Sequence, residues 1–348
     1  MSNSAPIRTT PGAAAVRHPA VVRLAWLVAG AGLLVVLAIV SVAVGNRAVP
    51  LDELLAALGG STEGVGPAAV VSRLPRTALA ILVGAALALA GATFQAVTRN
   101  PLADPGILGV SSGASLAVVA GMAFLGLSNP YVTIALAIVG AGGAAVFVYA
   151  VGSLGRGGAT PLKLALAGAA TTAALTSLIS AILLPRVDVM TSFRFWQIGG
   201  VGGAVWDRIA IVAPVMIVGA LLCLLTARGM NSLALGDDLA RGLGENVSRT
   251  RLIASLGAVV LCGAATAIAG PIGFVGLVVP HMCRLLVGTD HRWLLPFSAL
   301  VGSSLLLAAD VIGRVVARPT EIEVGVITAV LGAPFFIWLV RRQRVREL

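Results

Sequence analysis

The chain has 348 residues, of which 58% are hydrophobic and only 11% are charged. A soluble domain has about 25% charged residues, so this chain has too few charges to cover a soluble surface of its size. The composition argues against a soluble enzyme, a disordered protein and a nucleic-acid-binding domain, although the formal net charge is +10. We interpret the chain as an integral protein of the lipid bilayer that has no nucleic acid as a partner.

Two motifs that the sequence lacks narrow its chemistry. A phosphate-binding loop of the Walker type needs Gly-Lys-Ser/Thr, but the single lysine, Lys163, lies between two leucines. Three cysteines in apolar runs form neither a disulfide framework nor a zinc motif; they are Cys223, Cys262 and Cys283. We therefore expect this chain to have no Walker-type ATP site and no zinc site built from its cysteines.

Apolar stretches long enough to cross a membrane recur along the chain. A hydrocarbon core of about 30 Å requires about 20 apolar residues per helix. The first stretch is too long for a signal peptide and follows a polar leader, which predicts an uncleaved first span. The ten predicted spans are residues 24–44, 75–97, 106–127, 130–152, 163–184, 207–227, 251–270, 274–288, 293–312 and 324–340. The predicted fold class is therefore an all-α integral membrane protein with ten transmembrane helices.

The charge distribution predicts the orientation of these spans and the limits of the domain. If the N-terminus is cytoplasmic, cytoplasmic segments hold about two thirds of the 24 basic residues, as the positive-inside rule favours. Both termini are then cytoplasmic. The predicted organisation is a polar leader at residues 1–23, a ten-helix transmembrane domain at 24–341 and a basic tail at 342–348.

A weak internal repeat relates two of the spans. Ala-Leu-Ala-Gly at residues 88–91 is followed ten residues after its glycine by Pro101, and Ala-Ile-Ala-Gly at 267–270 is followed at the same distance by Pro280. In the predicted topology the two copies run in opposite directions. Inverted repeats are common in transporters, although chance similarity is an equal alternative in so Ala- and Gly-rich a chain.

The first polar interruption is Arg73-Leu74-Pro75-Arg76, at the predicted external entry to the second span. Two arginines three positions apart lie on one face of a helix. They either anchor the helix at the membrane interface by snorkelling or form an electropositive dock for an acidic partner. The residues alone leave both interpretations open.

The second interruption is residues 99–106, at the predicted inner end of the same span. Two prolines and a glycine in this segment favour a non-helical turn. Such backbone at membrane depth is tolerated only where it is buried in protein or lines a cavity. A simple connecting turn is the alternative.

The third interruption is the longest polar cytoplasmic loop, residues 228–251. Helix-forming residues alternate with three glycines there, which predicts short helices that lie across the membrane surface. The alternative is a solvated loop. Against it, four leucines form an apolar row that needs a surface to pack on; they are Leu233, Leu235, Leu239 and Leu243.

The fourth interruption is the glycine- and proline-rich segment 270–281, which leads into a span that Pro280 interrupts. His281 and Cys283 follow, and together they could suggest a metal pair. A lone histidine after a helix proline is more often a packing or hydrogen-bonding residue, so no metal is expected here.

Six motifs then follow one another: RLPRT, GAALALAGATFQAVTRNPLADPGILGVSSGAS, LALGDDLARGLG, GPIGFVGLVVPHMCRLLVGTDHRWLLP, LLLAADVIGR and GVITAVLGAPFFIWL. In this order they closely resemble the FecCD family, the membrane permeases of type II ABC importers for ferric siderophores, haem and cobalamin. The resemblance runs from about residue 25 to the C-terminus. It implies ten helices per subunit, an inverted relation between helices two to five and seven to ten, and a dimer with the pathway on its two-fold axis.

The resemblance also implies roles for particular residues. The family's external docking arginines correspond to Arg73, Arg76 and Arg314, although Asp310 lies four residues before Arg314 and is placed to pair with it. The inner gate corresponds to Asn100 and Leu102. A second gate, polar in the cobalamin permease, corresponds to residues 160–162, where this sequence departs from that pattern. The contact with the ATPase corresponds to 233–249, in particular to Leu235, Gly236, Leu239, Ala240, Arg241, Leu243 and Gly244.

The resemblance implies a non-catalytic permease subunit of a bacterial cell membrane with no cofactor of its own. Its expected cargo is a ferric siderophore, because iron–chelate members dominate the family. The resemblance implies three partners: cytoplasmic ABC ATPase subunits that bind ATP and magnesium, an extracytoplasmic substrate-binding protein, and a second permease subunit. Haem and cobalamin are alternative cargoes. A secondary transporter driven by protons or sodium is the rival class, but it would need ionisable groups at the bilayer midplane, and the acidic residues here cluster at loops and span ends.

Overall fold

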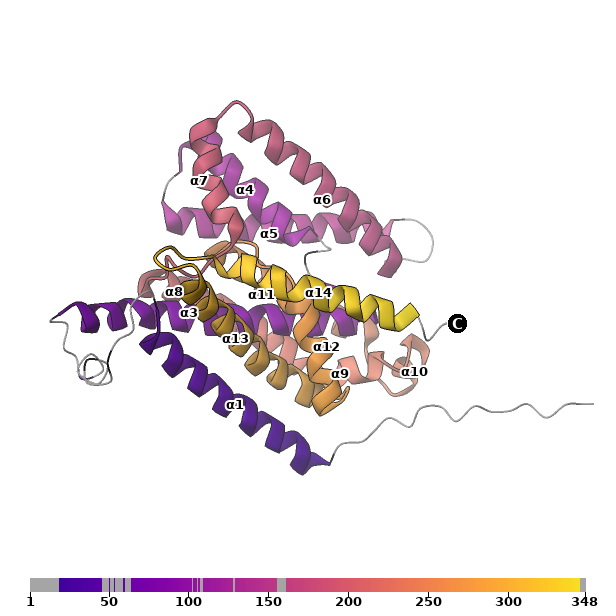
Figure 1. The fold of residues 1–348 in the computed structure, drawn as a ribbon. Helices are drawn as coiled ribbons and strands as arrows, with labels where there is room; N and C mark the ends of the chain where they lie inside the picture. Colours follow the sequence, from indigo (N-terminus) through magenta and orange to yellow (C-terminus); the bar gives the residue numbers. More distant parts are fainter. Residues whose placement is uncertain are drawn as a thin grey trace, which may run out of the picture.

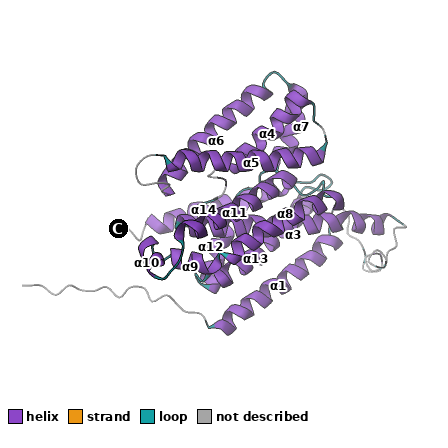
Figure 2. Ribbon diagram, turned by 180° about the vertical axis from the view of Figure 1, so that it is seen from behind, coloured by secondary structure: helices purple, strands orange, loops and turns teal. Residues whose placement is uncertain are grey.

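The computed structural model describes residues 19–45, 50, 53, 59, 64–101, 103, 104, 106, 109–127, 129–154 and 161–344. These residues form helices and no strands (Figures 1 and 2). The helices are α1 (Ala20–Ala43), α3 (Val65–Thr98), α4 (Val110–Leu125), α5 (Pro130–Ser153), α6 (Pro161–Leu183), α7 (Val187–Ile198), α8 (Trp206–Leu225), α9 (Ala227–Leu233), α10 (Asp237–Gly242), α11 (Val247–Ala269), α12 (Val275–Val287), α13 (His291–Val316) and α14 (Val324–Arg344).

Each of the ten predicted spans coincides with one of these helices. By length and composition, α1, α3, α5, α6, α8, α11 and α13 are able to cross a membrane, and α4, α12 and α14 contain shorter apolar helices of 10–17 residues. The multi-pass helical architecture is therefore confirmed. The exact number of ten crossings stays a prediction, since the described residues contain 13 helices of which seven meet the length for a span.

Three boundaries differ from the predicted ones. Helix α3 begins at Val65, ten residues before the predicted second span, and its 34 residues span about 51 Å at 1.5 Å per residue, which is longer than the hydrocarbon core. Helix α1 begins inside the predicted leader and α14 continues into the predicted tail. Helix α7 lies in a stretch where no span was predicted, because its 12 residues are too few to cross a bilayer and Asp188 and Arg194 interrupt its apolar residues.

The centre of the molecule is α3. Of its most apolar stretch 78% is buried, against 11% for α1, which lies at the periphery. Helix α3 packs against α13, α11, α12 and α8, whereas α4, α5 and α6 pack against one another with α7 beside them. Figures 1 and 2 show α4 to α7 together on one side of α3 and α1 on the other.

Glycines allow the central helices to cross at backbone contact. A Cβ atom on Gly84 would overlap the carbonyl of Gly302 in α13, and one on Gly91 would overlap the backbone of Gly276 in α12. Close approach through small residues is how helices associate in lipid, where apolar side chains gain little by leaving the hydrocarbon. These contacts set the position of α3 and with it the two polar ends that carry the candidate sites.

Candidate functional site

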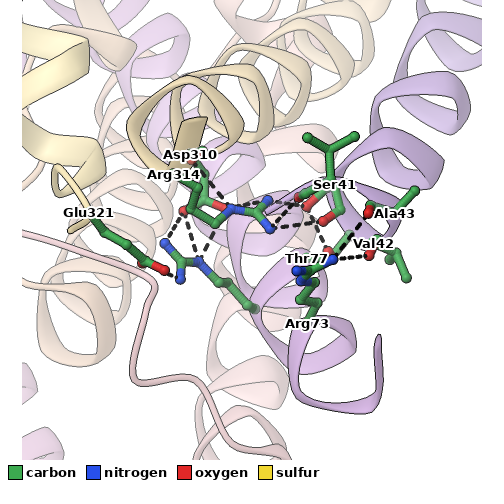
Figure 3. A network of polar contacts seen from close by, with 10 residues as sticks. Ser41, Val42, Ala43, Arg73, Thr77, Asp310, Arg314 and Glu321 are labelled. Atoms are coloured by element: carbon green, nitrogen blue, oxygen red, sulfur yellow. Dashed lines mark hydrogen bonds and ion pairs between the residues drawn. The ribbon is translucent and has the colours of Figure 1, made fainter. Parts of the chain in front are cut away.

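The first polar end is built where the C-terminal end of α1 meets α3 and α13. The last carbonyls of a helix lack intrahelical partners. Arg73 of α3 donates hydrogen bonds to two of these carbonyls in α1, Val42 O at 3.0 Å and Ala43 O at 3.1 Å. Its side chain is buried. Arg73 therefore holds the end of α1 against α3 (Figure 3).

Arg314 of α13 binds the same end of α1 from the other side. It donates to Ser41 O at 2.9 Å, Val44 O at 3.0 Å and Ser41 Oγ at 2.8 Å. It also forms an ion pair with Asp310 at 2.9 Å, one helical turn earlier. Figure 3 shows Arg314 between Asp310 and Ser41. Only 2% of Arg314 and 1% of Asp310 is exposed, so this pair lies inside the protein.

Arg76 connects the buried pair to the surface. Its Nε and Nη2 donate to Asp310 Oδ1 at 2.9 Å and 2.8 Å, and its Nη1 donates to Glu321 Oε2 at 2.7 Å. Glu321, in the segment between α13 and α14, is partly exposed. We call Arg73, Arg76, Asp310, Arg314 and Glu321 the arginine cluster. It contains three guanidinium groups and two carboxylates, so it keeps an excess of positive charge.

The predicted pairing of Arg314 with Asp310 is confirmed by this geometry. The docking role of the three arginines stays a prediction. In this conformation Arg73 and Arg314 bind α1 and are buried. The side chain of Arg76 is only 11% exposed, so Glu321, at 34%, forms the edge of the cluster that is open to solvent. The spacing of the two α3 arginines indicated a shared face, but it could not indicate that this face packs against another helix.

The opposite end of α3 carries the predicted gate. Helix α3 ends at Thr98, and its capping residue Arg99 adopts a left-handed conformation with φ 50°. The following Asn100 is exposed, and its carbonyl accepts a hydrogen bond from Ala103 N at 3.1 Å. Leu102 lies outside the described residues, as does Thr160 of the second gate. The non-helical turn is confirmed, and the gate stays a prediction.

Asp104 organises this turn. Its Oδ1 accepts a hydrogen bond from Gly106 N at 2.8 Å, the pattern of an Asx turn. Burial raises the pKa of Asp104, and the hydrogen bond from Gly106 only partly opposes that shift. Its carboxyl also lies close to Gly276 of α12, so the turn is seated on protein, as expected for irregular backbone at this depth.

The segment predicted to contact an ATPase lies at this same end, where α9 and α10 form the predicted short helices. Leu233 and Ala240 are buried, but Leu235, Leu239 and Leu243 are 56%, 63% and 68% exposed. The apolar row is therefore mostly uncovered. Gly236 and Gly244, with φ of 105° and 83°, take conformations at the two ends of α10 that favour glycine.

Ion pairs attach this segment to the rest of the bundle. Asp237, in the first turn of α10, pairs with Arg99 at 3.1 Å and with Arg251 of α11 at 3.2 Å. Arg241 pairs with Asp238 within α10 at 3.2 Å and points outward. These ion pairs connect α10 to the end of α3 and to α11.

No group of three or more metal-ligating side chains occurs among the residues that the structure describes. His281 packs edge-on against Phe335, and Cys283 is buried and free. The fold and the two polar ends thus define a multi-pass helical membrane protein with an apolar surface row at one end and an arginine cluster at the other.

Comparison with known proteins places the chain in a family. Residues 33–342 match the model of the FecCD transport family, and the chain belongs to that family, whose members are non-catalytic membrane permeases of ABC transporters. It is 47% identical over 313 residues to the ferric enterobactin transport system permease protein FepD of Escherichia coli (strain K12), which covers 89% of this chain and 93% of that protein.

A further relative and a solved structure support the assignment to a family of ABC transporter permeases. The chain is 41% identical over 277 residues to the hemin transport system permease protein HmuU of Yersinia pestis, covering 78% of this chain and 82% of that protein. A solved inward-facing structure of a metal-chelate type ABC transporter superposes with a TM-score of 0.80 at 28% identity, covering 92% of this chain and 99% of the other.

Proposed function

We propose that this chain is the permease subunit of an ATP-driven importer for a ferric siderophore. The observation that carries the proposal is the family match over residues 33–342 together with relatives whose names refer to ferric enterobactin and iron(3+)-hydroxamate transport. The subunit provides the pathway and does no chemistry. ATP and magnesium bind to a partner ATPase, and the cargo arrives on an extracytoplasmic binding protein.

The ATPase is assigned to the end that carries α9 and α10, which we place in the cytoplasm together with both termini. The exposed leucines Leu235, Leu239 and Leu243 support this assignment, because an apolar row on a polar segment is stabilised when a partner covers it. The ion pairs of Asp237 with Arg99 and Arg251 would carry a movement of α10 to the turn that holds Asn100. A second permease subunit completes the pathway.

The binding protein is assigned to the opposite end, over the arginine cluster. Arginine suits such a dock because it engages carboxylates bidentately and stays charged. In this proposal Glu321 forms an ion pair with Arg76 in the free permease, and acidic groups of the binding protein compete with Glu321 for Arg76. The Glu321→Gln variant should therefore strengthen docking, and salt should weaken docking of the wild type. Glu323→Gln is a comparison variant, because Glu323 also lies in the electrostatic field of Arg76 but accepts no hydrogen bond from it, so docking should rise less than in Glu321→Gln. Docking that responds to neither salt nor Glu321→Gln would refute this assignment.

The cargo is identified by purification. The complex of permease, ATPase and binding protein is isolated from iron-limited cells, and the bound ligand is analysed by mass spectrometry. An iron-loaded siderophore is the expected result. If the bound ligand is haem or cobalamin, the importer function stands and the siderophore assignment is wrong. A permease that purifies without any ATPase and still transports would contradict the proposal.

A further inference from the structure

A cavity of about 820 Å³ lies at the end of the bundle that carries α9. Its walls come from the first turn of α1, the last turn of α3, α9, the last turn of α12 and the first turn of α13. Four arginines and one carboxylate line it; they are Arg23, Arg99, Arg284, Arg292 and Asp290. The cavity is within the size range of small-ligand sites, about 300–1,000 Å³, and its charge is strongly positive.

The single carboxylate in this cavity is already occupied. Asp290 accepts hydrogen bonds from Asn231 at 2.7 Å and from Arg292 at 3.0 Å, and it pairs with Arg23 at 3.5 Å. Burial alone would raise the pKa of Asp290, but the hydrogen bonds from Arg292 and Asn231 outweigh it and lower the pKa from 3.8 to about 2. Asp290 therefore stays ionised and has little capacity left for a further cation.

Two guanidinium groups in the cavity remain undercompensated. Arg284 donates to the neutral amide oxygen of Gln95, and within the described part of the chain it forms no ion pair. The Nε of Arg23 is buried and has no hydrogen-bond partner there. Arg23 shares its counter-charge, Asp290, with Arg292, and Arg284 has none among the described residues. A partly buried guanidinium group with too little counter-charge is costly unless a ligand supplies negative charge. Arg99, by contrast, already pairs with Asp237 outside the cavity.

We propose that this cavity binds the phosphate group of an anionic phospholipid of the adjacent leaflet. Guanidinium groups bind phosphate bidentately, and basic pockets between transmembrane helices on the cytoplasmic side are suited to lipid headgroups. The lipid assignment follows from α1, which brings Arg23 into the cavity while its neighbours Leu24 and Val28 are 55% and 65% exposed. Acyl chains can lie along this apolar face while the phosphate meets Arg23 and Arg284.

The inference depends on the proposed orientation of the subunit and not on its cargo. The bound lipid would join α1, α3, α12 and α13 directly beside α9, and so would brace the end of the bundle on which the ATPase is proposed to act. A soluble phosphate has the same headgroup chemistry, and an acidic surface of the ATPase is a different occupant. Both are separated from the lipid by the experiment.

The test is lipid binding to the full-length protein, delipidated in detergent and titrated while the bound lipids are counted by native mass spectrometry. The probes are phosphatidylglycerol, phosphatidylcholine and inorganic phosphate. The variant Arg23→Gln with Arg284→Gln should bind phosphatidylglycerol about 30-fold more weakly, from about 1 kcal/mol for each arginine near a membrane surface. The matched control is Arg228→Gln with Arg249→Gln, which removes two exposed charges at the same end outside the cavity.

A second pair of variants leaves every arginine in place. Thr289 lines the cavity and is exposed, so Thr289→Glu adds a negative charge to it, whereas Thr289→Gln is a neutral control of the same size. Phosphatidylglycerol binding should fall in the first and persist in the second. Equal losses in the cavity and control double variants would overturn the proposal, and so would arginine-dependent binding of inorganic phosphate without lipid binding. If the cavity variants bind lipid as the wild type does but no longer co-purify with the ATPase, the lipid proposal is wrong and the cavity contacts the ATPase instead.

Discussion

Replacement of the Asp310 carboxylate by an amide tests the arginine cluster most sharply. Asp310 is 1% exposed, bonds Arg76 at 2.9 Å and 2.8 Å and pairs with Arg314 at 2.9 Å. Asp310→Asn keeps the shape but leaves two guanidinium groups facing a neutral group. Breaking a buried ion pair from one side costs about 3–5 kcal/mol, because the other charge stays buried. Arg76 retains Glu321, so we expect a loss of about 3–4 kcal/mol in the free energy of unfolding.

The assay is unfolding of the purified protein in mixed detergent micelles. The free cysteines Cys223, Cys262 and Cys283 are all buried, so a thiol-reactive dye reports the opening of the bundle. Asp238→Asn is the control, since that side chain is fully exposed on α10. The double variant Asp310→Asn with Arg314→Gln should lose less than the two single losses combined, because it removes one of the stranded charges. A loss under about 1 kcal/mol, or one equal to that of the control, would refute the reasoning.

Three other predictions use different parts of the fold. Leu239→Asp with Leu243→Asp should release the ATPase in co-purification without a change in unfolding, because both side chains are exposed; full retention of the ATPase would contradict the assignment of this surface. The pKa of Asp290 is lowered to about 2. Its stabilising contribution is therefore complete above the pKa of about 4 in the unfolded chain and is lost as the pH falls toward 2. Thermal unfolding between pH 2 and 7 should show this loss of stability in the wild type and not in Asp290→Asn. Gly84→Ala should lower the free energy of unfolding by about 1–3 kcal/mol, because the added Cβ atom would overlap Gly302. At Gly143 an added Cβ atom would meet no neighbouring atom within 4 Å, so Gly143→Ala should raise the free energy of unfolding by up to about 1 kcal/mol. Equal effects of the two variants in unfolding experiments would refute the close crossing of α3 and α13.

The sequence was sufficient to predict the helical spans, because an apolar run of about 20 residues has few alternatives in a bilayer. It was also sufficient for the Asp310–Arg314 pair, since a spacing of four places both on one helix face. The short helices α9 and α10 followed from helix-forming residues broken by Gly236 and Gly244. These features are local, and local spacing determines them.

The contacts between distant segments could not be predicted in this way. Arg73 binds carbonyls of α1 that are 30 and 31 positions away, and Arg76 meets Asp310 across 234 positions. Their spacing showed two cations on one face but not whether that face meets water or a helix. The pairing of Gln95 with Arg284 gave no signal for the same reason, because no periodicity relates α3 to α12.

The most direct test of the central claim is transport in proteoliposomes that contain this permease with its ATPase and binding protein. Uptake of the iron-loaded siderophore recovered from the purified complex is measured with ATP enclosed in the cytoplasmic compartment, and again with a proton gradient alone. We predict uptake that requires ATP and the binding protein and that vanadate abolishes. Iron-chelate uptake by this chain alone, driven by the proton gradient without an ATPase, would contradict the account.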